Sequence, residues 1–103
     1  KLTRLRIFPD EAGAMNCSVR DVKGEILAVS QFTLFASAKK GNRPSWGRAA
    51  RSDISQPLFD RFACLLETDL GRAVPKGVFG ADMKIHLIND GPVTLAFDTK
   101  NPE

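Results

Sequence analysis

Two different hydrophobic rhythms divide the chain. In one region apolar residues recur every three or four positions, which is the spacing of one face of an α-helix. These residues are Leu58, Phe62, Leu65, Leu66 and Leu70. Ser55 is suited to cap the helix, Pro57 is tolerated in a first turn, and Gly71 provides a C-terminal stop. The pattern predicts a helix over 56–70.

The strongest apolar run is rich in branched and aromatic side chains. It extends from Glu25 to Phe35 with few polar interruptions, which predicts a central strand that is buried on both faces. Residues 83–89 and 93–97 alternate polar and apolar positions instead, as in half-buried strands. These two segments flank a turn at Gly91-Pro92.

The first 24 residues predict less regular structure. Residues 10–13 and 21–24 have the acidic and glycine content of tight turns, and a short strand is expected over 14–20 between them. Residues 2–8 fit either the end of a helix or the start of a strand.

Composition bounds the class of protein. A chain of 103 residues with 43% hydrophobic and 26% charged residues fits one compact domain, and no apolar run is long enough to cross a bilayer. Cys17 and Cys64 lie far apart without a neighbouring Cys or His cluster, so the sequence contains no zinc-binding motif. We expect reduced thiols in a cytoplasmic protein that has no signal peptide.

The net charge of +3 is mild, but its cations gather in one polar segment between residues 36 and 55. Lys39, Lys40, Arg43 and Arg48 lie there beside Trp46, a combination that is suited to phosphate contact or base stacking. Long loops in compact domains are often functional. A solvated surface loop explains the same residues equally well.

Ordinary hydrolase chemistry is hard to find in the sequence. The only histidine is His86, which we interpret as a surface residue of a strand, and the carboxylates fall in turns or on the polar helix face. The glycines form no phosphate-binding loop. We therefore expect neither a metal nor a cofactor.

Two features of the sequence stand out. Ser30, Gln31 and Thr33 lie within the apolar central run, where polar groups require partners, so they mark either a site or an internally bonded strand end. A Gly91-Pro92 bond between strands can adopt the cis form at small cost, although an ordinary hairpin turn accounts for the pattern as well.

Together these segments resemble a known family. Ser30-Gln-Phe-Thr-Leu34 and Asn89-Asp-Gly-Pro-Val-Thr94 are similar, in the same order, to the two signature motifs of the D-aminoacyl-tRNA deacylases. Residues 40–45 and 79–83 also resemble that family. Four matching segments are far more specific than one.

The resemblance implies a fold. Its members have an α/β fold with a mixed barrel-like sheet and helices packed on one side, and they form homodimers with active sites at the subunit interface. Residues 1–103 would then be a single domain of this kind. The family's first two strands and most of its first helix would precede residue 1.

The resemblance also implies roles for residues. Ser30, Gln31, Phe32 and Thr33 would line the pocket, with backbone N–H groups near Phe32 stabilising an oxyanion. A cis Gly91-Pro92 would exclude L-amino acids by steric clash. The same selection site would include Asn89, Val93, Thr94 and Met83.

The implied substrate is the acceptor end of aminoacyl-tRNA, esterified with a D-amino acid or glycine. Lys39, Lys40, Arg43 and Arg48 would contact the tRNA, and no membrane or DNA partner is expected. Thr33 lacks a base, so the implied mechanism relies on the 2′-OH of the terminal adenosine.

Two alternatives remain. A related deacylase that clears L-alanine has a trans Gly-Pro bond and a different Ser-Gln-Phe-Thr segment, whereas Ser30–Thr33 is intact here. A non-catalytic tRNA-binding module would keep the basic loop, residues 39–51, without cleaving the ester.

Overall fold

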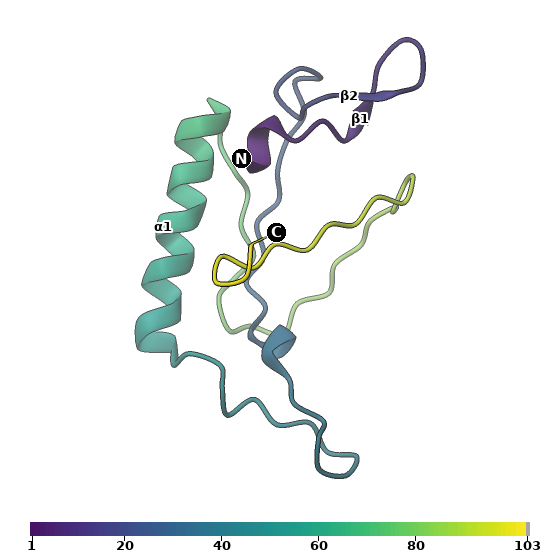
Figure 1. The fold of residues 1–103 in the computed structure, drawn as a ribbon. Helices are drawn as coiled ribbons and strands as arrows, with labels where there is room; N and C mark the ends of the chain where they lie inside the picture. The colour runs from purple at the N-terminus through teal and green to yellow at the C-terminus, as the bar shows by residue number, and fades with distance from the viewer. Residues whose placement is uncertain (103) are drawn as a thin grey trace.

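One long helix lies along one side of the molecule, and extended segments lie beside it (Figure 1). The computed structural model describes residues 1–102. The order of elements is η1 (Leu2–Arg4), β1 (Phe8–Pro9), β2 (Met15–Cys17), η2 (Phe32–Phe35) and α1 (Ser52–Leu70). The predicted α/β class is confirmed in this coarse form, with an antiparallel sheet and one helix.

The N-terminal hairpin is built on Asp10. Its carboxylate accepts hydrogen bonds from the Ala12 and Ala14 N–H groups, each at 2.9 Å, and from the Asn16 amide at 2.8 Å. The Asn16 contact is the main reason that the pKa of Asp10 is lowered. Across this turn, which ends at Gly13 with φ 84°, β1 pairs antiparallel with β2. The predicted turn is confirmed, and the expected strand over 14–20 is shorter than predicted.

The helix is longer than its pattern predicted. α1 begins at Ser52 rather than after Ser55, because the Ile54 and Ser55 N–H groups already bond to the Arg51 carbonyl at 3.0 and 2.9 Å. The cap predicted at Ser55 is therefore wrong: its hydroxyl donates to the same Arg51 carbonyl at 3.0 Å, and Pro57 lies inside the helix.

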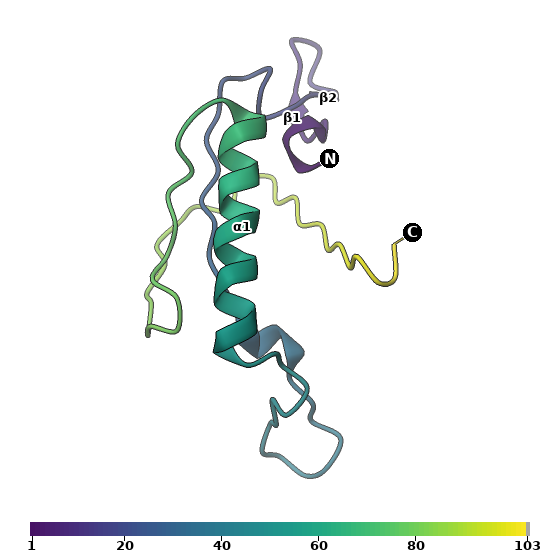
Figure 2. The same cartoon turned by 90° about the vertical axis from the view of Figure 1, so that its left-hand side faces the viewer.

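The end of the helix is as predicted. Gly71 adopts a left-handed conformation with φ 81°, which a residue without Cβ reaches at no steric cost, and its N–H bonds to the Glu67 carbonyl at 2.9 Å. The Glu67 side chain then accepts the Val74 N–H at 3.0 Å. These contacts turn the chain back along the helix (Figure 2).

The core lies against the C-terminal half of α1. Its buried members are Val19, Ala28, Leu66, Leu70 and Val74, with Phe8, Ile26 and Phe59 partly buried around them. Of the helical positions predicted to be apolar and inward, Leu66 and Leu70 are buried, whereas Leu58 is 64% exposed. Phe62 and Leu65 are also exposed.

The predicted central strand is wrong. Between Glu25 and Phe35 the structure pairs Ala28 alone, through the Ala28 N–H to the Pro75 carbonyl at 2.9 Å and the Gly77 N–H to the Ala28 carbonyl at 3.0 Å. From Phe32 the chain winds into the 3-10 helix η2, with Leu34 83% exposed. A run of branched residues forms a strand only where neighbouring strands pair with it.

The strands predicted at 83–89 and 93–97 are also wrong. Both segments are extended and lead to and from a turn at Gly91-Pro92 (Figure 1), but among the described residues no ladder joins them. His86 lies on the surface, as expected, although not in a strand. The radius of gyration is 16.1 Å, against about 13 Å for a compact domain of this length.

Charge contacts hold the N-terminus on the helix. Thr3, which is 1% exposed, donates its hydroxyl to Asp69, and Arg4 and Arg20 lie 3.7 and 3.9 Å from the same carboxylate. The Thr3 hydrogen bond is the largest cause that lowers the pKa of Asp69 below 3.8, and burial opposes it. This contact joins η1 to the end of α1.

The lowered pKa of Asp69 predicts a pH-dependent stability. The contribution of the ionised carboxylate is present above pH 3.8 and is lost as the pH falls through the depressed pKa of the folded state. We expect Asp69→Asn to lower the midpoint of urea unfolding at neutral pH. The difference from the parent should shrink below pH 3.8. A difference that stays constant in acid, or one matched by Glu11→Gln in the exposed hairpin turn, would contradict this role.

Candidate functional site

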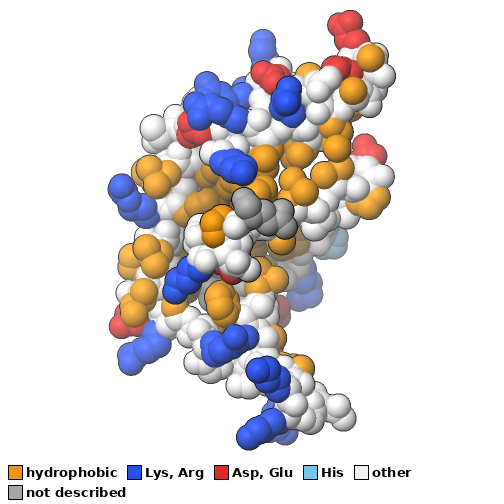
Figure 3. Space-filling view, in the orientation of Figure 1, with side chains coloured by type: hydrophobic (Ala, Val, Ile, Leu, Met, Phe, Trp, Pro, Cys, Tyr) orange, Lys and Arg blue, Asp and Glu red, His pale blue; other side chains and the backbone are white. Residues whose placement is uncertain are grey.

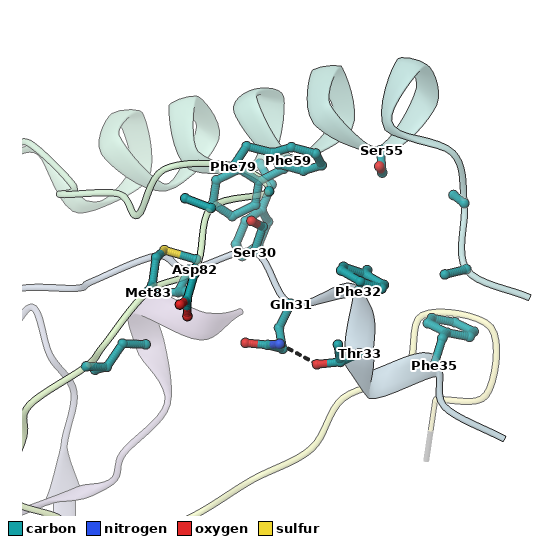
Figure 4. Close-up of a pocket in the computed structure, with 17 residues that line it drawn as sticks. Ser30, Gln31, Phe32, Thr33, Phe35, Ser55, Phe59, Phe79, Asp82 and Met83 are labelled. Carbon is teal, nitrogen blue, oxygen red and sulfur yellow. Dashed lines mark hydrogen bonds between the residues drawn. The ribbon is translucent and has the colours of Figure 1, made fainter. Parts of the chain in front are cut away.

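A cavity of about 570 Å³ opens between η2, the N-terminal half of α1 and the segment after Gly77 (Figure 4). Its wall contains all four residues predicted to be catalytic, Ser30, Gln31, Phe32 and Thr33, and also Met83. The remaining lining residues are Val29, Phe35, Ala49, Ala50, Ser55, Phe59, Phe62, Phe79, Gly80, Ala81, Asp82 and Ile85. The cavity is therefore mostly apolar, with a few polar groups, as small-molecule sites commonly are.

Local geometry presents the Ser30–Thr33 segment to the cavity. The bridge at Ala28 sets the position of the chain, and η2 then turns Phe32 and Thr33 across the cavity wall. The Gln31 amide donates to the Thr33 hydroxyl (Figure 4). The Thr33 hydroxyl is thus bonded to an amide, a group that does not act as a general base.

Aromatic contacts shape both ends of the cavity. Phe59 of α1 and Phe79 lie with ring centroids 6.2 Å apart, and Phe32 meets Trp46 edge-on at 6.0 Å and 72°. Met83 lies close to Gly77, where an added Cβ would be 2.6 Å from its sulfur. The absence of a side chain at Gly77 therefore leaves room for Met83 on the wall.

Asp82 is the residue that the sequence patterns missed. We expected no carboxylate beside Ser30–Thr33, yet Asp82 lines the same cavity and is the only ionisable residue among those that line it. Its side chain is 93% exposed and lies 4.0 Å from the Lys84 ammonium. A solvated turn residue gives no periodic signal, so only the fold brings Asp82 to Gln31.

Apart from Met83, the residues predicted to select chirality lie elsewhere. The Gly91-Pro92 bond is cis, the form that the resemblance implied. Asn89, Gly91, Pro92, Val93 and Thr94 do not line the cavity of their own chain. They form the tip of the extended excursion that Figure 1 shows projecting from the body.

The basic loop forms a second hollow, of about 420 Å³. All four predicted tRNA-binding residues line it, together with Ser37, Ser45 and Gly47; the four are Lys39, Lys40, Arg43 and Arg48. Figure 3 shows cationic side chains gathered at this lower end of the molecule. The structure thus brings together cations that are up to nine positions apart in sequence.

Metal and membrane sites do not emerge from residues 1–102. No group of three or more His, Cys, Asp or Glu in that range is arranged to hold a metal ion. Within the same range, no helix is both long and apolar enough to cross a membrane.

Comparisons with known proteins find similar sequences and a similar solved structure. The family described as D-Tyr-tRNA(Tyr) deacylase matches residues 1–98. The D-aminoacyl-tRNA deacylases of Dechloromonas aromatica and Chromobacterium violaceum are 67% and 65% identical over the whole chain, which covers 69% of each. A solved structure named c-Myc DNA Unwinding Element Binding Protein matches with a TM-score of 0.80 at 39% identity.

The chain spans about two thirds of the length of its relatives. The match to the solved structure covers 92% of this chain and 64% of that one. The family and the hydrolase class predicted from the two motifs are confirmed by these matches. With Ser30–Thr33 of its first motif on the cavity wall and its whole length aligned to named deacylases, the chain belongs to the D-aminoacyl-tRNA deacylase family.

Proposed function

We propose that this protein hydrolyses the ester bond between a D-amino acid, or glycine, and tRNA, and so removes mischarged tRNA during translation in the cytoplasm. The observation that carries the proposal is the cavity wall formed by Ser30–Thr33 and Met83 in a member of this family. An aminoacyl group is small and mostly apolar, as the cavity is.

The protein's part in the reaction is positioning. Thr33 is bonded to the Gln31 amide, so it is not activated as a nucleophile. Backbone N–H groups around Phe32 would stabilise the oxyanion of the attacked ester. The 2′-OH of the terminal adenosine helps to activate the water, and Thr33 is structural.

Selection against L-amino acids occurs by exclusion. The Gly91-Pro92 tip lies away from the cavity of its own chain, which fits a role in the cavity of a second subunit. Ile88 and Leu87 beside this tip are 92% and 71% exposed, and a homodimer interface would bury them. A backbone wall that rejects one configuration accepts many D side chains.

The acceptor end of the tRNA binds along the basic loop. Lys39, Lys40, Arg43 and Arg48 share one hollow, and clustered cations attract phosphates without regard to sequence. The loop continues through Ala49 and Ala50 into the cavity wall. A single path therefore leads from the phosphates to the ester.

The chirality of the substrate is the first test. With matched D- and L-aminoacyl-tRNA, we expect this protein in its full-length form to cleave the D-ester and glycyl-tRNA and to spare the L-ester, because exclusion acts at the α-carbon. Release of labelled amino acid measures both rates. Cleavage of L-alanyl-tRNA alone, or binding of uncharged tRNA without cleavage, would contradict the proposal.

A second test separates the two mechanisms. Thr33→Ala should keep at least about a tenth of the parent's kcat, whereas loss of a true nucleophile costs roughly a million-fold. A substrate ending in 2′-deoxyadenosine should react roughly a hundred-fold to ten-thousand-fold more slowly, the usual contribution of a general base. Single-turnover rates measure the chemical step.

Asp82→Asn supplies the comparison for that test. If Asp82 were the base, this variant would lose activity on the ribose-ended substrate as severely as the deoxy substrate does with the parent. We expect a change of less than about tenfold, because the Asp82 side chain is 93% exposed and its charge is screened by water.

Salt dependence tests the basic loop. Arg43→Ala should weaken tRNA binding and reduce the slope of log affinity against log salt by about 0.7–0.9, the value for one lost phosphate contact. Filter binding between low and physiological salt measures the slope. Lys100→Ala, outside the loop, should leave it unchanged. An equal loss for both variants would show that only net charge matters.

A further inference from the structure

Trp46 connects the basic loop to the catalytic segment. Its indole Nε1–H donates to the Thr33 carbonyl at 3.1 Å, and its ring meets the Phe32 ring edge-on at 6.0 Å. Trp46 is 37% exposed, so part of its surface is covered by these contacts. It is the chain's only tryptophan.

The loop before Trp46 is closed at its base. The Ser37 N–H bonds to the Ser45 carbonyl at 2.7 Å, and the Ser45 N–H bonds back to the Ser37 carbonyl at 2.9 Å. Lys39, Lys40 and Arg43 therefore lie on a closed loop whose two ends are joined. A shift of the loop therefore also shifts its base, because the two ends are hydrogen-bonded to each other.

The chain after Trp46 is anchored as well. The Ala49 N–H bonds to the Trp46 carbonyl at 3.0 Å, and Ala49 and Ala50 line the cavity. Trp46 thus follows the closed loop directly after Ser45, and its two hydrogen bonds go to Thr33 and Ala49, which both line the cavity. Its side chain therefore contacts the Phe32 ring and the Thr33 backbone, the segment to which the proposed function assigns the oxyanion donors.

We propose that Trp46 is a positioning residue. When tRNA phosphates bind to the basic loop, Trp46 holds the backbone of Phe32 and Thr33 in its reactive position. This inference rests on the proposed function. Binding energy from a remote part of a substrate raises kcat when it is used to set the reacting groups in place. Phosphates on Lys39, Lys40, Arg43 and Arg48 would hold the loop, and Trp46 would hold the oxyanion donors.

The experiment compares two substrates of the full-length protein. One is D-aminoacyl-tRNA, and the other is the 3′-D-aminoacyl ester of adenosine, which has no phosphates for the loop. Trp46→Ala should lower kcat for the tRNA substrate by about tenfold, the effect of one hydrogen bond and an aromatic contact on a rate. Its KM and salt slope should stay within about twofold, because the loop cations remain.

The adenosine ester supplies the decisive contrast. Its cleavage should change by less than about twofold in Trp46→Ala, since no phosphate is present to act through Trp46. An equal loss of kcat on both substrates would reduce Trp46 to ordinary packing and overturn the proposal. Trp46→Phe keeps the ring but removes the Nε1–H, so its kcat on tRNA should lie between that of Trp46→Ala and that of the parent.

A double-mutant cycle gives an independent readout. Arg43→Ala should lower kcat in the parent and leave it unchanged in the Trp46→Ala background, where it should alter only KM. Additive effects on kcat would contradict the coupling. Leu58→Ala, which truncates a 64% exposed residue of α1 outside the cavity, is the control for general loss of packing.

The outcomes separate this inference from the proposed function. If the parent does not cleave D-aminoacyl-tRNA, the proposed function itself is wrong. If the parent is active and Trp46→Ala, with a parent-like circular dichroism spectrum, has the parent's kcat on both substrates, only the inference fails.

Discussion

The site depends on one short parallel pairing. Ala28 bonds to Pro75 and Gly77 on either side of Lys76, and this pairing is the sole parallel bridge within residues 1–102. It places the Ser30–Thr33 segment beside the segment that leads to Met83, although the two lie about fifty positions apart in sequence. Because Ala28 is 5% exposed in the core against α1, the cavity wall is tied to the most buried part of the fold.

The buried core and the cavity lie at opposite ends of α1. The core residues Leu66, Leu70 and Val74 lie at the end of α1, whereas the cavity lies at its start, where Phe59 and Phe62 are only partly covered. A helix that is buried at one end and open at the other can hold a rigid scaffold and a site together. Loops that contact substrate are drawn from the less stable parts of a structure.

Local chemistry explains which features were predictable from sequence. The turn at Asp10 and the stop at Gly71 depend on residues a few positions apart, and both were predicted correctly. The family motifs indicated Ser30–Thr33. The strand expected over 25–35 failed because pairing is a property of neighbours, which periodicity does not contain. Asp82 was missed for the same reason, since its place on the cavity follows from tertiary structure.

Under the proposed function, a cavity without a strong base would obtain its rate from the placement of the reacting groups. Thr33 is bonded to an amide, and Asp82, the one ionisable group on the wall, is almost fully exposed, so neither resembles the buried groups of acid–base enzymes. Fixing the reacting groups in place costs conformational entropy, and the small aminoacyl group makes too few contacts to offset that cost. The tRNA is the large part of the substrate, and the binding free energy of its phosphate contacts can offset that cost. Under the proposed function, such an enzyme would join its basic loop firmly to the Phe32–Thr33 segment, and Trp46 of that loop contacts both residues.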